Sequence, residues 1–146
     1  MYQHILVSTD GSELARKGID QGLALAKSLG AKVTIVTVTE RLPVYTGFDG
    51  GLTALAYDDY TASQRAAAEQ VLGAAKAAAA GSGVAVETVM VENALPADAI
   101  VTTAKARGCD LIAMASHGRR GLGRLVLGSV TSEVLTQSDV PVLVVR

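Results

Sequence analysis

The 146-residue chain is poor in several residue types, and each scarcity narrows its possible functions. Its one cysteine, Cys109, cannot form an internal disulfide, and no Cys and His spacing matches a zinc site. We therefore expect a reducing, cytoplasmic location. Four Tyr, one Phe and no Trp are too few for a base-stacking surface, and a net charge of -1 attracts no polyanion. We expect no nucleic-acid partner.

Long apolar runs are also missing, and none approaches the ~18 residues that a membrane span requires. The segment 1–4 leads into a short apolar stretch without the basic region or cleavage site of a secretory signal. We therefore expect neither secretion nor membrane insertion. A chain of this length can bury roughly 70% of its unfolded surface in one core, so we expect a single domain over residues 1–146.

The apolar pattern predicts an α/β fold, because short runs of Val, Ile and Leu alternate with longer amphipathic segments. The expected strands are Tyr2–Thr9, Lys32–Thr39, Val84–Val91, Cys109–Ala115 and Val140–Val145. The expected helices are Ser12–Leu29, Tyr57–Ala80, Ala97–Arg107 and Ser129–Ser138, with C-cap glycines at Gly30, at Gly81 with Gly83, and at Gly108. Nearly continuous apolar strands are buried on both faces, which indicates an open, twisted, doubly wound parallel sheet with helices on both faces.

Two further segments have a predicted place in this fold. The buried stripe of the second helix is expected at Ala67, Val71, Leu72, Ala75 and Ala79. The segment Glu40–Ala56 has neither the apolar period of a helix nor that of a strand, and it is long for a connection between a strand and a helix. A lid is therefore one possible role. Ligands of doubly wound sheets bind beyond the carboxyl ends of the strands, so the loops that follow the strands are the candidate sites.

The glycine-rich loop Ser116–Gly128 has the composition of an anion site, because it runs into the start of a helix. Glycine lets main-chain N–H groups point inward, and a helix start adds unpaired donors and about half a positive charge. Ser129 and Thr131 add hydroxyl donors, and three arginines could reach a phosphate: Arg119, Arg120 and Arg124. The alternative is a surface loop shaped by glycine, with solvated arginines and Ser129 as a helix cap.

Two nucleotide motifs do not fit. In the stretch Gly118–Leu125, Arg124 and Leu125 stand where a P-loop needs Lys and Ser or Thr, which disfavours Walker-type hydrolysis. No G-x-G-x-x-G sequence lies between the first strand and the first helix, so we expect no NAD.

Three side chains could have chemical roles. Asp10 fits the N-cap of a capping box with Glu13, and it could also accept hydrogen bonds from a ribose hydroxyl or an adenine amine. His117 has no neighbouring carboxylate or nucleophile, so a hydrogen-bonding role is favoured over acid-base catalysis. Cys109 opens a buried strand and is expected to be inert.

Together these residues resemble the universal stress protein family over essentially the whole chain. The resemblance rests on Thr9-Asp10-Gly11-Ser12, Ser116-His117-Gly118, Gly128-Ser129 and Pro141-Val142-Leu143-Val144-Val145. The family motif is Gly, two residues, Gly, nine residues, then Gly with Ser or Thr, and here Ala115 replaces its first glycine. The added methyl would weaken binding if that position needs positive φ, and is harmless if small size suffices. We favour the second interpretation.

The resemblance implies a Rossmann-like sheet of the adenine nucleotide alpha hydrolase-like type, in the order 3-2-1-4-5, that binds ATP, ADP or AMP, with or without Mg²⁺. The adenine and ribose end would be lined by Ser8, Thr9 and Asp10, with Val38 beside the base and Met114 and Ala115 as the floor. The phosphates would receive donors from Gly118, Gly128, Ser129, Val130 and Thr131. The loop residues His117, Arg119 and Arg120 complete the expected site.

The resemblance implies a nucleotide-dependent stress-response or regulatory binding module without catalytic residues. One alternative is a slow ATPase or phosphotransferase, with Asp10 on magnesium and Ser129 or Thr131 orienting the γ-phosphate. The other is a nucleotide-free dimeric scaffold. In the implied strand order, Val140–Val145 is an apolar edge that could pair with a second copy, so we expect a homodimer unless a loop covers the edge. A protein partner of unknown identity is also expected.

Overall fold

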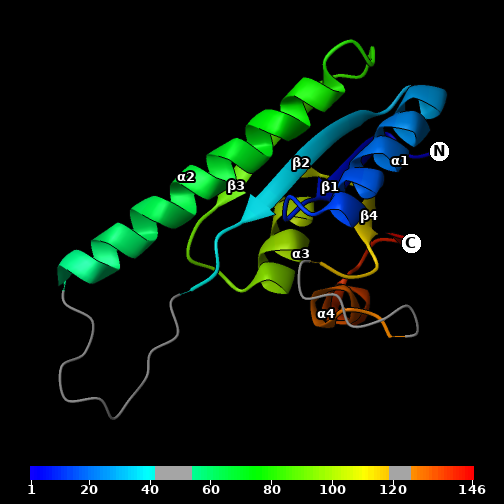
Figure 1. The fold of residues 1–146 in the computed structure, drawn as a ribbon. Helices are drawn as coiled ribbons and strands as arrows, with labels where there is room; N and C mark the ends of the chain where they lie inside the picture. Colours follow the sequence, from blue (N-terminus) through cyan, green and yellow to red (C-terminus); the bar gives the residue numbers. More distant parts are fainter. Residues whose placement is uncertain (42–53, 119–125) are drawn as a thin grey trace.

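The computed structural model describes residues 1–41, 54–118 and 126–146. In these ranges five parallel strands form one sheet in the order β3-β2-β1-β4-β5, which confirms the predicted fold class and strand order (Figure 1). The strands are β1 (His4–Ser8), β2 (Lys32–Val38), β3 (Val86–Val91), β4 (Leu111–Ala115) and β5 (Val142–Val145). The helices are α1 (Glu13–Leu29), α2 (Ala54–Ala79), α3 (Pro96–Arg107) and α4 (Ser129–Gln137).

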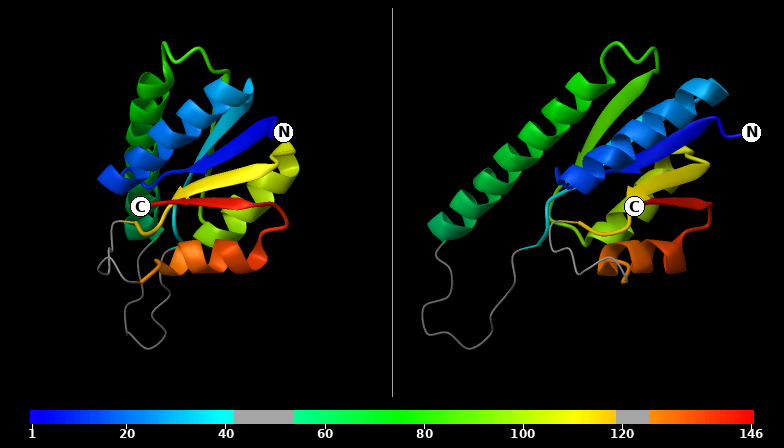
Figure 2. Two further views of the ribbon diagram at one scale, coloured as in Figure 1. Left: turned by 90° about the vertical axis from the view of Figure 1, so that its right-hand side faces the viewer. Right: turned by 45° about the vertical axis from the view of Figure 1, so that its right-hand side comes forward.

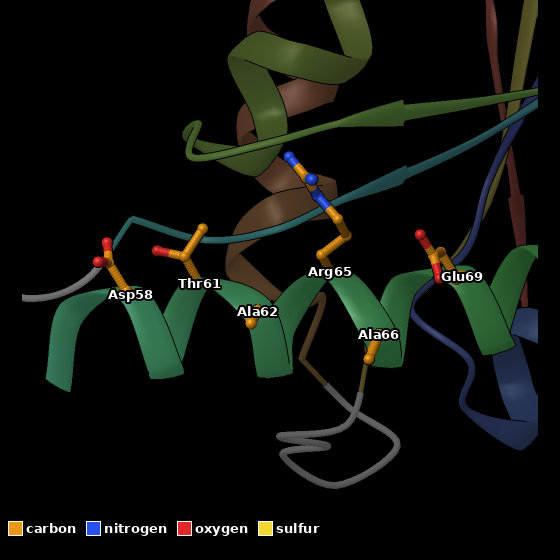
Figure 3. Close-up of a pocket in the computed structure, with 6 residues that line it drawn as sticks. All are labelled: Asp58, Thr61, Ala62, Arg65, Ala66 and Glu69. Carbon is orange, nitrogen blue, oxygen red and sulfur yellow. The ribbon is translucent and has the colours of Figure 1, made fainter. Parts of the chain in front are cut away.

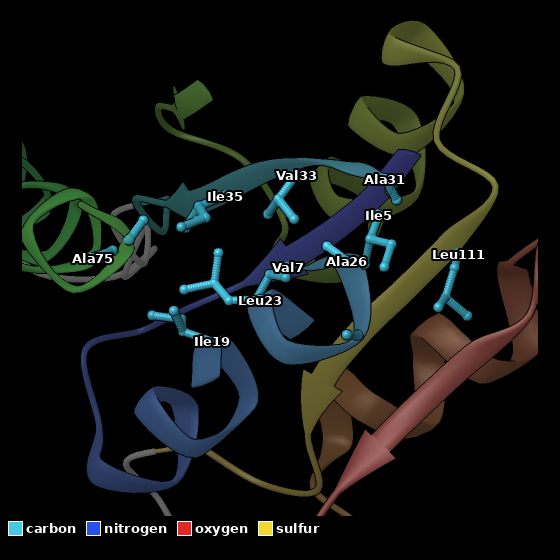
Figure 4. Packing of buried hydrophobic residues seen from close by; sticks show 12 residues of the cluster. Ile5, Val7, Ile19, Leu23, Ala26, Ala31, Val33, Ile35, Ala75 and Leu111 are labelled. Atoms are coloured by element: carbon cyan, nitrogen blue, oxygen red, sulfur yellow. The ribbon is translucent and has the colours of Figure 1, made fainter. Parts of the chain in front are cut away.

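Helices cover both faces of the sheet, with α1 and α2 on one face and α3 and α4 on the other (Figure 2). The central strands are buried on both faces because their side chains alternate between two clusters. Ile5 and Val7 of β1 join the cluster under α1 and α2, seen in Figure 4, whereas Leu6 joins the cluster under α3 and α4. The core therefore surrounds β1, β2 and β4 and leaves β3 and β5 as edges.

Four of the five strands begin two residues later than predicted. At two of these places, a side-chain oxygen accepts the main-chain hydrogen bond that a neighbouring strand would otherwise accept. The Asp110 carboxylate accepts hydrogen bonds from the N–H groups of Gln3 and His4, at 2.9 and 3.0 Å. The Ser138 hydroxyl accepts one from the Val140 N–H at 3.1 Å. Local polar contacts of this kind compete with the sheet and are invisible to apolar patterns.

The long helix α2 begins at Ala54, three residues before its predicted start. Its buried residues are Ala68, Ala75 and Ala79, whereas Ala67 is exposed, so the predicted stripe is wrong at that position. Helical periodicity explains the difference, because positions separated by 7 and 11 residues from Ala68 share its face. No residue before Ala68 is buried, and the first half of α2 extends past the sheet in Figure 1. The rest of the Glu40–Ala56 lid prediction concerns residues 42–53, which lie outside the described ranges.

Helix α1 packs closely on the sheet through two glycines. A Cβ atom placed on Gly22 would lie 2.6 Å from Val7 Cγ2, which is closer than any packed pair of carbon atoms. A Cβ on Gly18 would lie 3.6 Å from the Ala115 nitrogen, an ordinary contact. The close packing of α1 on the sheet therefore requires glycine at position 22 but not at position 18.

The amino ends of the strands carry a polar network that is buried at His4 and Thr34 and exposed at Glu87 and Arg107. Thr34 Oγ1 donates to Glu87 Oε1 at 2.7 Å, so the same oxygen must accept the 2.7 Å hydrogen bond from His4 Nε2. Arg107 donates to the other Glu87 oxygen at 3.0 Å. Burial is the main cause that lowers the pKa of His4, and the hydrogen bond from Thr34 lowers the pKa of Glu87. The network joins three strands to α3 at the end of the sheet away from the candidate site.

Candidate functional site

The chain turns sharply after β1, and this turn places Asp10 at the carboxyl edge of the sheet. Thr9 Oγ1 accepts a hydrogen bond from the Gly11 N–H at 3.2 Å, and Asp10 Oδ1 accepts one from the Ser12 N–H at 2.9 Å. Gly11 has a φ of 82°, a value that side chains disfavour and glycine allows. These two short-range hydrogen bonds hold the Asp10 carboxylate in place before α1 begins.

The N-cap of α1 is Ser12, so the predicted capping box is wrong. The Ser12 hydroxyl accepts a hydrogen bond from the Ala15 N–H at 3.1 Å. Glu13 is the first helical residue, too early to return to an N-cap as the third residue of a capping box does. Asp10 lies two residues before the cap, which leaves its carboxylate at the loop.

Thr37 of β2 anchors the same turn from the neighbouring strand. The Thr37 hydroxyl donates to the Thr9 carbonyl at 2.8 Å, and the Thr9 N–H donates to the Val36 carbonyl at 2.9 Å. Thr9 is therefore fixed to β2 on both sides of its own backbone. Sequence analysis missed this role of Thr37, although a threonine inside a buried strand must find a partner for its hydroxyl.

The loop after β4 meets the loop after β1 at one point. A Cβ atom added to Gly118 would collide with Asp10 Oδ2 and lie 3.4 Å from Asp10 Cγ. The two loops that the sequence singled out are thus in contact, and a side chain at position 118 would require the Asp10 carboxylate to shift. The predicted Arg119 and Arg120 lie outside the described residues, as does Arg124.

The start of α4 is tied to the end of β4 by two hydrogen bonds. The Gly128 N–H donates to the Ser116 carbonyl at 2.8 Å, and the Thr131 hydroxyl donates to the Ala115 carbonyl at 2.8 Å. Two of the predicted phosphate donors, the Gly128 N–H and the Thr131 hydroxyl, are therefore engaged within the protein. A Cβ on Gly128 would lie 3.0 Å from His117 Cα, so the contribution of Gly128 is close approach rather than a free N–H.

Other main-chain donors remain at this helix start. Gly128 is the N-cap of α4, and the first helical hydrogen bond runs from the Ser132 N–H to the Gly128 carbonyl at 3.0 Å. The N–H groups of Ser129, Val130 and Thr131 precede that bond, as the first amides of any helix do, and have no partner in the described ranges. With the positive end of the helix dipole, they form a place where an anion would be stabilised.

The remaining predicted residues lie along the strand ends. Ser8 and Val38 are half-buried, whereas Met114 is buried and packs with Val38 in the cluster under α3 and α4. Ala115 ends β4 and is 8% exposed. Among described residues other than glycine, positive φ occurs only at Asn93, so the backbone at Ala115 does not require glycine. This supports the interpretation that the methyl group there is tolerated.

His117 and Cys109 have different surroundings. His117 is half-buried, and its Nδ1 lies 3.0 Å from the hydroxyl of Ser116, a hydrogen bond between neighbours. Cys109 is buried at the other end of the sheet, and burial raises the pKa of its thiol to about 11. The predicted inertness of Cys109 agrees with this environment, since the thiolate is the reactive form.

A hollow of about 340 Å³ lies along α2, away from the loops just described (Figure 3). Its lining residues are Asp58, Thr61, Ala62, Arg65, Ala66 and Glu69. All of them belong to one helix, so the hollow is an open groove rather than a meeting point of several elements. The Arg65 guanidinium donates two hydrogen bonds to the Glu92 carboxylate, at 2.7 and 2.9 Å. This ion pair lowers the pKa of Glu92 and attaches α2 to the end of β3.

Within residues 1–41, 54–118 and 126–146, no three His, Cys, Asp or Glu side chains are grouped as metal ligands would be. In the same ranges, no helix combines the length and the apolar character that crossing a bilayer would need.

The sequence model of the universal stress protein family matches residues 1–146. The chain belongs to the universal stress protein family. Universal stress protein YxiE of Bacillus subtilis (strain 168) is 35% identical over 152 residues, with 100% of both chains covered. Universal stress protein MJ0531 of Methanocaldococcus jannaschii is 31% identical and aligns over 100% of this chain and 83% of its own length.

One solved structure of a universal stress protein is described as a complex with cAMP. It is 27% identical to this chain, with a TM-score of 0.68, and the alignment covers 99% of this chain and 97% of that one. The two loops described above, with Gly118 against Asp10 and Gly128 at the start of α4, therefore belong to a universal stress protein fold.

Proposed function

We propose that this universal stress protein binds an adenine nucleotide, ATP or its products ADP and AMP, at the carboxyl ends of β1 and β4. The observation that carries the proposal is the meeting of the two loops, where Gly118 lies against the Asp10 carboxylate. Strand order reverses between these two strands, which is where doubly wound sheets bind ligands. A relative with bound cAMP supports adenine nucleotides as the ligand class.

The phosphate end of the nucleotide would lie at the start of α4. The main-chain N–H groups of Ser129, Val130 and Thr131 would donate there, and Gly128 would keep the approach open. Arg119 and Arg120 would add charge from the adjacent loop. Three or four charge-assisted hydrogen bonds of about 1.5 to 3 kcal/mol each, offset by an association cost of at least ~4 kcal/mol, limit the affinity to about micromolar at best.

The ribose and base would lie between Asp10 and the end of β2. An ionised carboxylate has about four acceptor sites, so Asp10 can accept from a ribose hydroxyl while it holds the Ser12 N–H. Ser8, Thr9 and Val38 would line this end, with Met114 and Ala115 beneath the ligand and His117 beside it. Where Mg²⁺ accompanies ATP, it would be held mainly by phosphates together with a single carboxylate.

The binding event would make the protein a nucleotide-dependent regulatory module of the cytoplasm, formed by one domain over residues 1–146. We further propose that it acts as a homodimer joined through β5. The edge position of β5 and the 37% exposure of Leu143 support this assembly.

Isothermal titration with ATP, ADP and AMP, with and without Mg²⁺, tests the proposed function. We expect micromolar binding of at least one of these nucleotides, and mass spectrometry of the purified protein should identify the one that is carried along. If none of the three gives heat under any condition and no nucleotide accompanies the protein, the proposal is wrong.

The variant Gly118→Ala tests the place of the site. Its methyl group would displace the Asp10 carboxylate, so we expect nucleotide affinity to fall roughly tenfold or more. Gly73→Ala is the matched control, because a Cβ at that position on α2 meets no atom within 4 Å. The control should bind like the wild type, and equal affinities of Gly118→Ala and the wild type would place the site elsewhere.

A further inference from the structure

Two buried threonines connect the loops of the proposed site to elements beside them. Thr37 is 4% exposed and donates to the carbonyl of Thr9, the residue before Asp10. Thr131 is 2% exposed and donates to the carbonyl of Ala115, the last residue of β4. Both hydrogen bonds measure 2.8 Å, and both reach the point where the chain leaves the sheet.

The bond made by Thr131 limits what its side chain can do for a ligand. A hydroxyl carries one proton, and that of Thr131 is directed to Ala115. A nucleotide phosphate accepts hydrogen bonds and cannot supply the missing proton. The side chain of Thr131 can therefore fix the first turn of α4, which includes the N–H groups of Ser129 and Val130, on β4. It cannot donate to the phosphate while that bond lasts.

Thr37 has the corresponding place at the other loop. Its hydroxyl holds the Thr9 carbonyl, and the Val36 carbonyl holds the Thr9 N–H. The peptide units on both sides of Thr9 are thus fixed to β2. Asp10 follows directly, so the start of its backbone is held beside Gly118, and the Ser12 N–H holds one oxygen of its carboxylate.

Other threonines on helices show that this arrangement is not general. Thr136 of α4 and Thr61 of α2 each donate to a carbonyl four residues earlier in their own helix, at 2.9 and 3.0 Å. Such local bonds are common for threonine in helices and join no two elements. The hydrogen bonds of Thr37 and Thr131 span 28 and 16 residues and connect separate elements.

We propose that Thr37 and Thr131 are positioning residues, which fix Asp10 and the start of α4 so that the two halves of the nucleotide site face each other. This inference rests on the proposed nucleotide site. It assigns separate tasks to the two residues, since Thr131 serves the phosphate end and Thr37 serves the ribose and base end.

The experiment measures ATP and adenosine binding by isothermal titration to Thr131→Val, Thr37→Val and the corresponding serine variants. Valine keeps the shape and removes the hydroxyl, so we expect the Kd for ATP to rise roughly five- to tenfold in both valine variants, as the loss of one hydrogen bond allows. Thr131→Val should leave adenosine binding unchanged, whereas Thr37→Val should weaken it. Serine restores the hydroxyl and should return the affinity to that of the wild type. Thr136→Val is the matched control on α4 and should change nothing.

A second measurement separates positioning from direct contact with the ligand. Amide hydrogen exchange of nucleotide-free protein should be faster at Gly128 and Ser132 in Thr131→Val, because the first turn of α4 loses its tie to β4. Unchanged exchange at these amides, or a loss of ATP and adenosine affinity in equal proportion, would overturn the proposal for Thr131. Wild-type affinity for both ligands in Thr37→Val would overturn it for Thr37. If the wild type itself does not bind ATP, the proposed function fails instead.

Discussion

At the scale of single residues, the thiol of Cys109 gives the protein an alkaline limit of stability. Burial raises its pKa to about 11 from an ordinary value of 9.0, so between these values the folded chain holds a proton that the unfolded chain has lost. The folded state is therefore destabilised as pH rises through this window. The contribution of the protonated Cys109 thiol to the free energy of unfolding is complete below pH 9 and is lost above the pKa of the folded state.

We expect the free energy of unfolding to fall by roughly 2 to 3 kcal/mol more in the wild type than in Cys109→Ala between pH 9 and 11. Urea unfolding followed by circular dichroism at several pH values measures this difference. The alanine variant loses the titrating group and shares every other ionisable side chain, so it serves as the control. Parallel stability curves for the two proteins would contradict the assignment.

Some residue roles could be predicted from sequence, and others could not. The glycine at position 118 and the carboxylate at position 10 are visible in the motif, and the structure brings them together. The capping role of Ser12 was missed because Asp10 and Glu13 have the spacing of a capping box that begins two residues too early. The internal hydrogen bonds of Gly128 and Thr131 depend on how α4 meets β4, which no local pattern contains.

At the scale of elements, the contact between α1 and the sheet depends on which glycine faces which atom. Gly22 lies over Val7, whereas Gly18 lies over the main chain of β4 with room for a methyl group. Two substitutions of identical chemistry on the same helix should therefore have opposite effects.

Gly22→Ala should lower the free energy of unfolding by about 1 to 3 kcal/mol, as overpacked cores do. Gly18→Ala should leave it unchanged or raise it by up to about 1 kcal/mol, because alanine favours helix. Urea denaturation of the two variants and the wild type decides the matter. A loss of stability in Gly18→Ala equal to that in Gly22→Ala would show that the packing differs from the one described.

Element boundaries show where periodicity stops being informative. The apolar pattern located the nine elements of residues 1–41, 54–118 and 126–146, because burial on two faces leaves a strong signal. The starts of the strands were displaced where Asp110 and Ser138 take over main-chain hydrogen bonds. The start of α2 at Ala54 was missed because none of the residues 54–60 is buried, so they carry no periodic apolar signal.

At the scale of the whole molecule, β5 leaves one side of the sheet without a partner strand in the described part of the chain. The carbonyls of Pro141 and Val145 accept hydrogen bonds from the N–H groups of Ile112 in β4 and of Ser116 directly after it, at 3.0 and 2.8 Å. Because a parallel ladder uses alternate residues, the main-chain groups of Val142 and Val144 face outward. A second copy could pair with these groups in the antiparallel direction.

Val144→Pro removes an outward N–H without touching the bonds to β4, and we expect it to convert the proposed dimer into a monomer of 14.9 kDa. Val144→Thr keeps the N–H and should remain dimeric. Analytical ultracentrifugation at micromolar concentration measures both. A wild type that sediments as a single 14.9 kDa chain would contradict the assembly.

All five strands point the same way, so the ionisable network of His4, Glu87 and Arg107 lies at one pole of the molecule and the loops around Asp10 at the other. The shifted pKa values of His4 and Glu87 belong to the former pole, whereas substitutions in the loops act on the latter. Resistance to pH and choice of ligand can consequently diverge along independent evolutionary routes within a single scaffold.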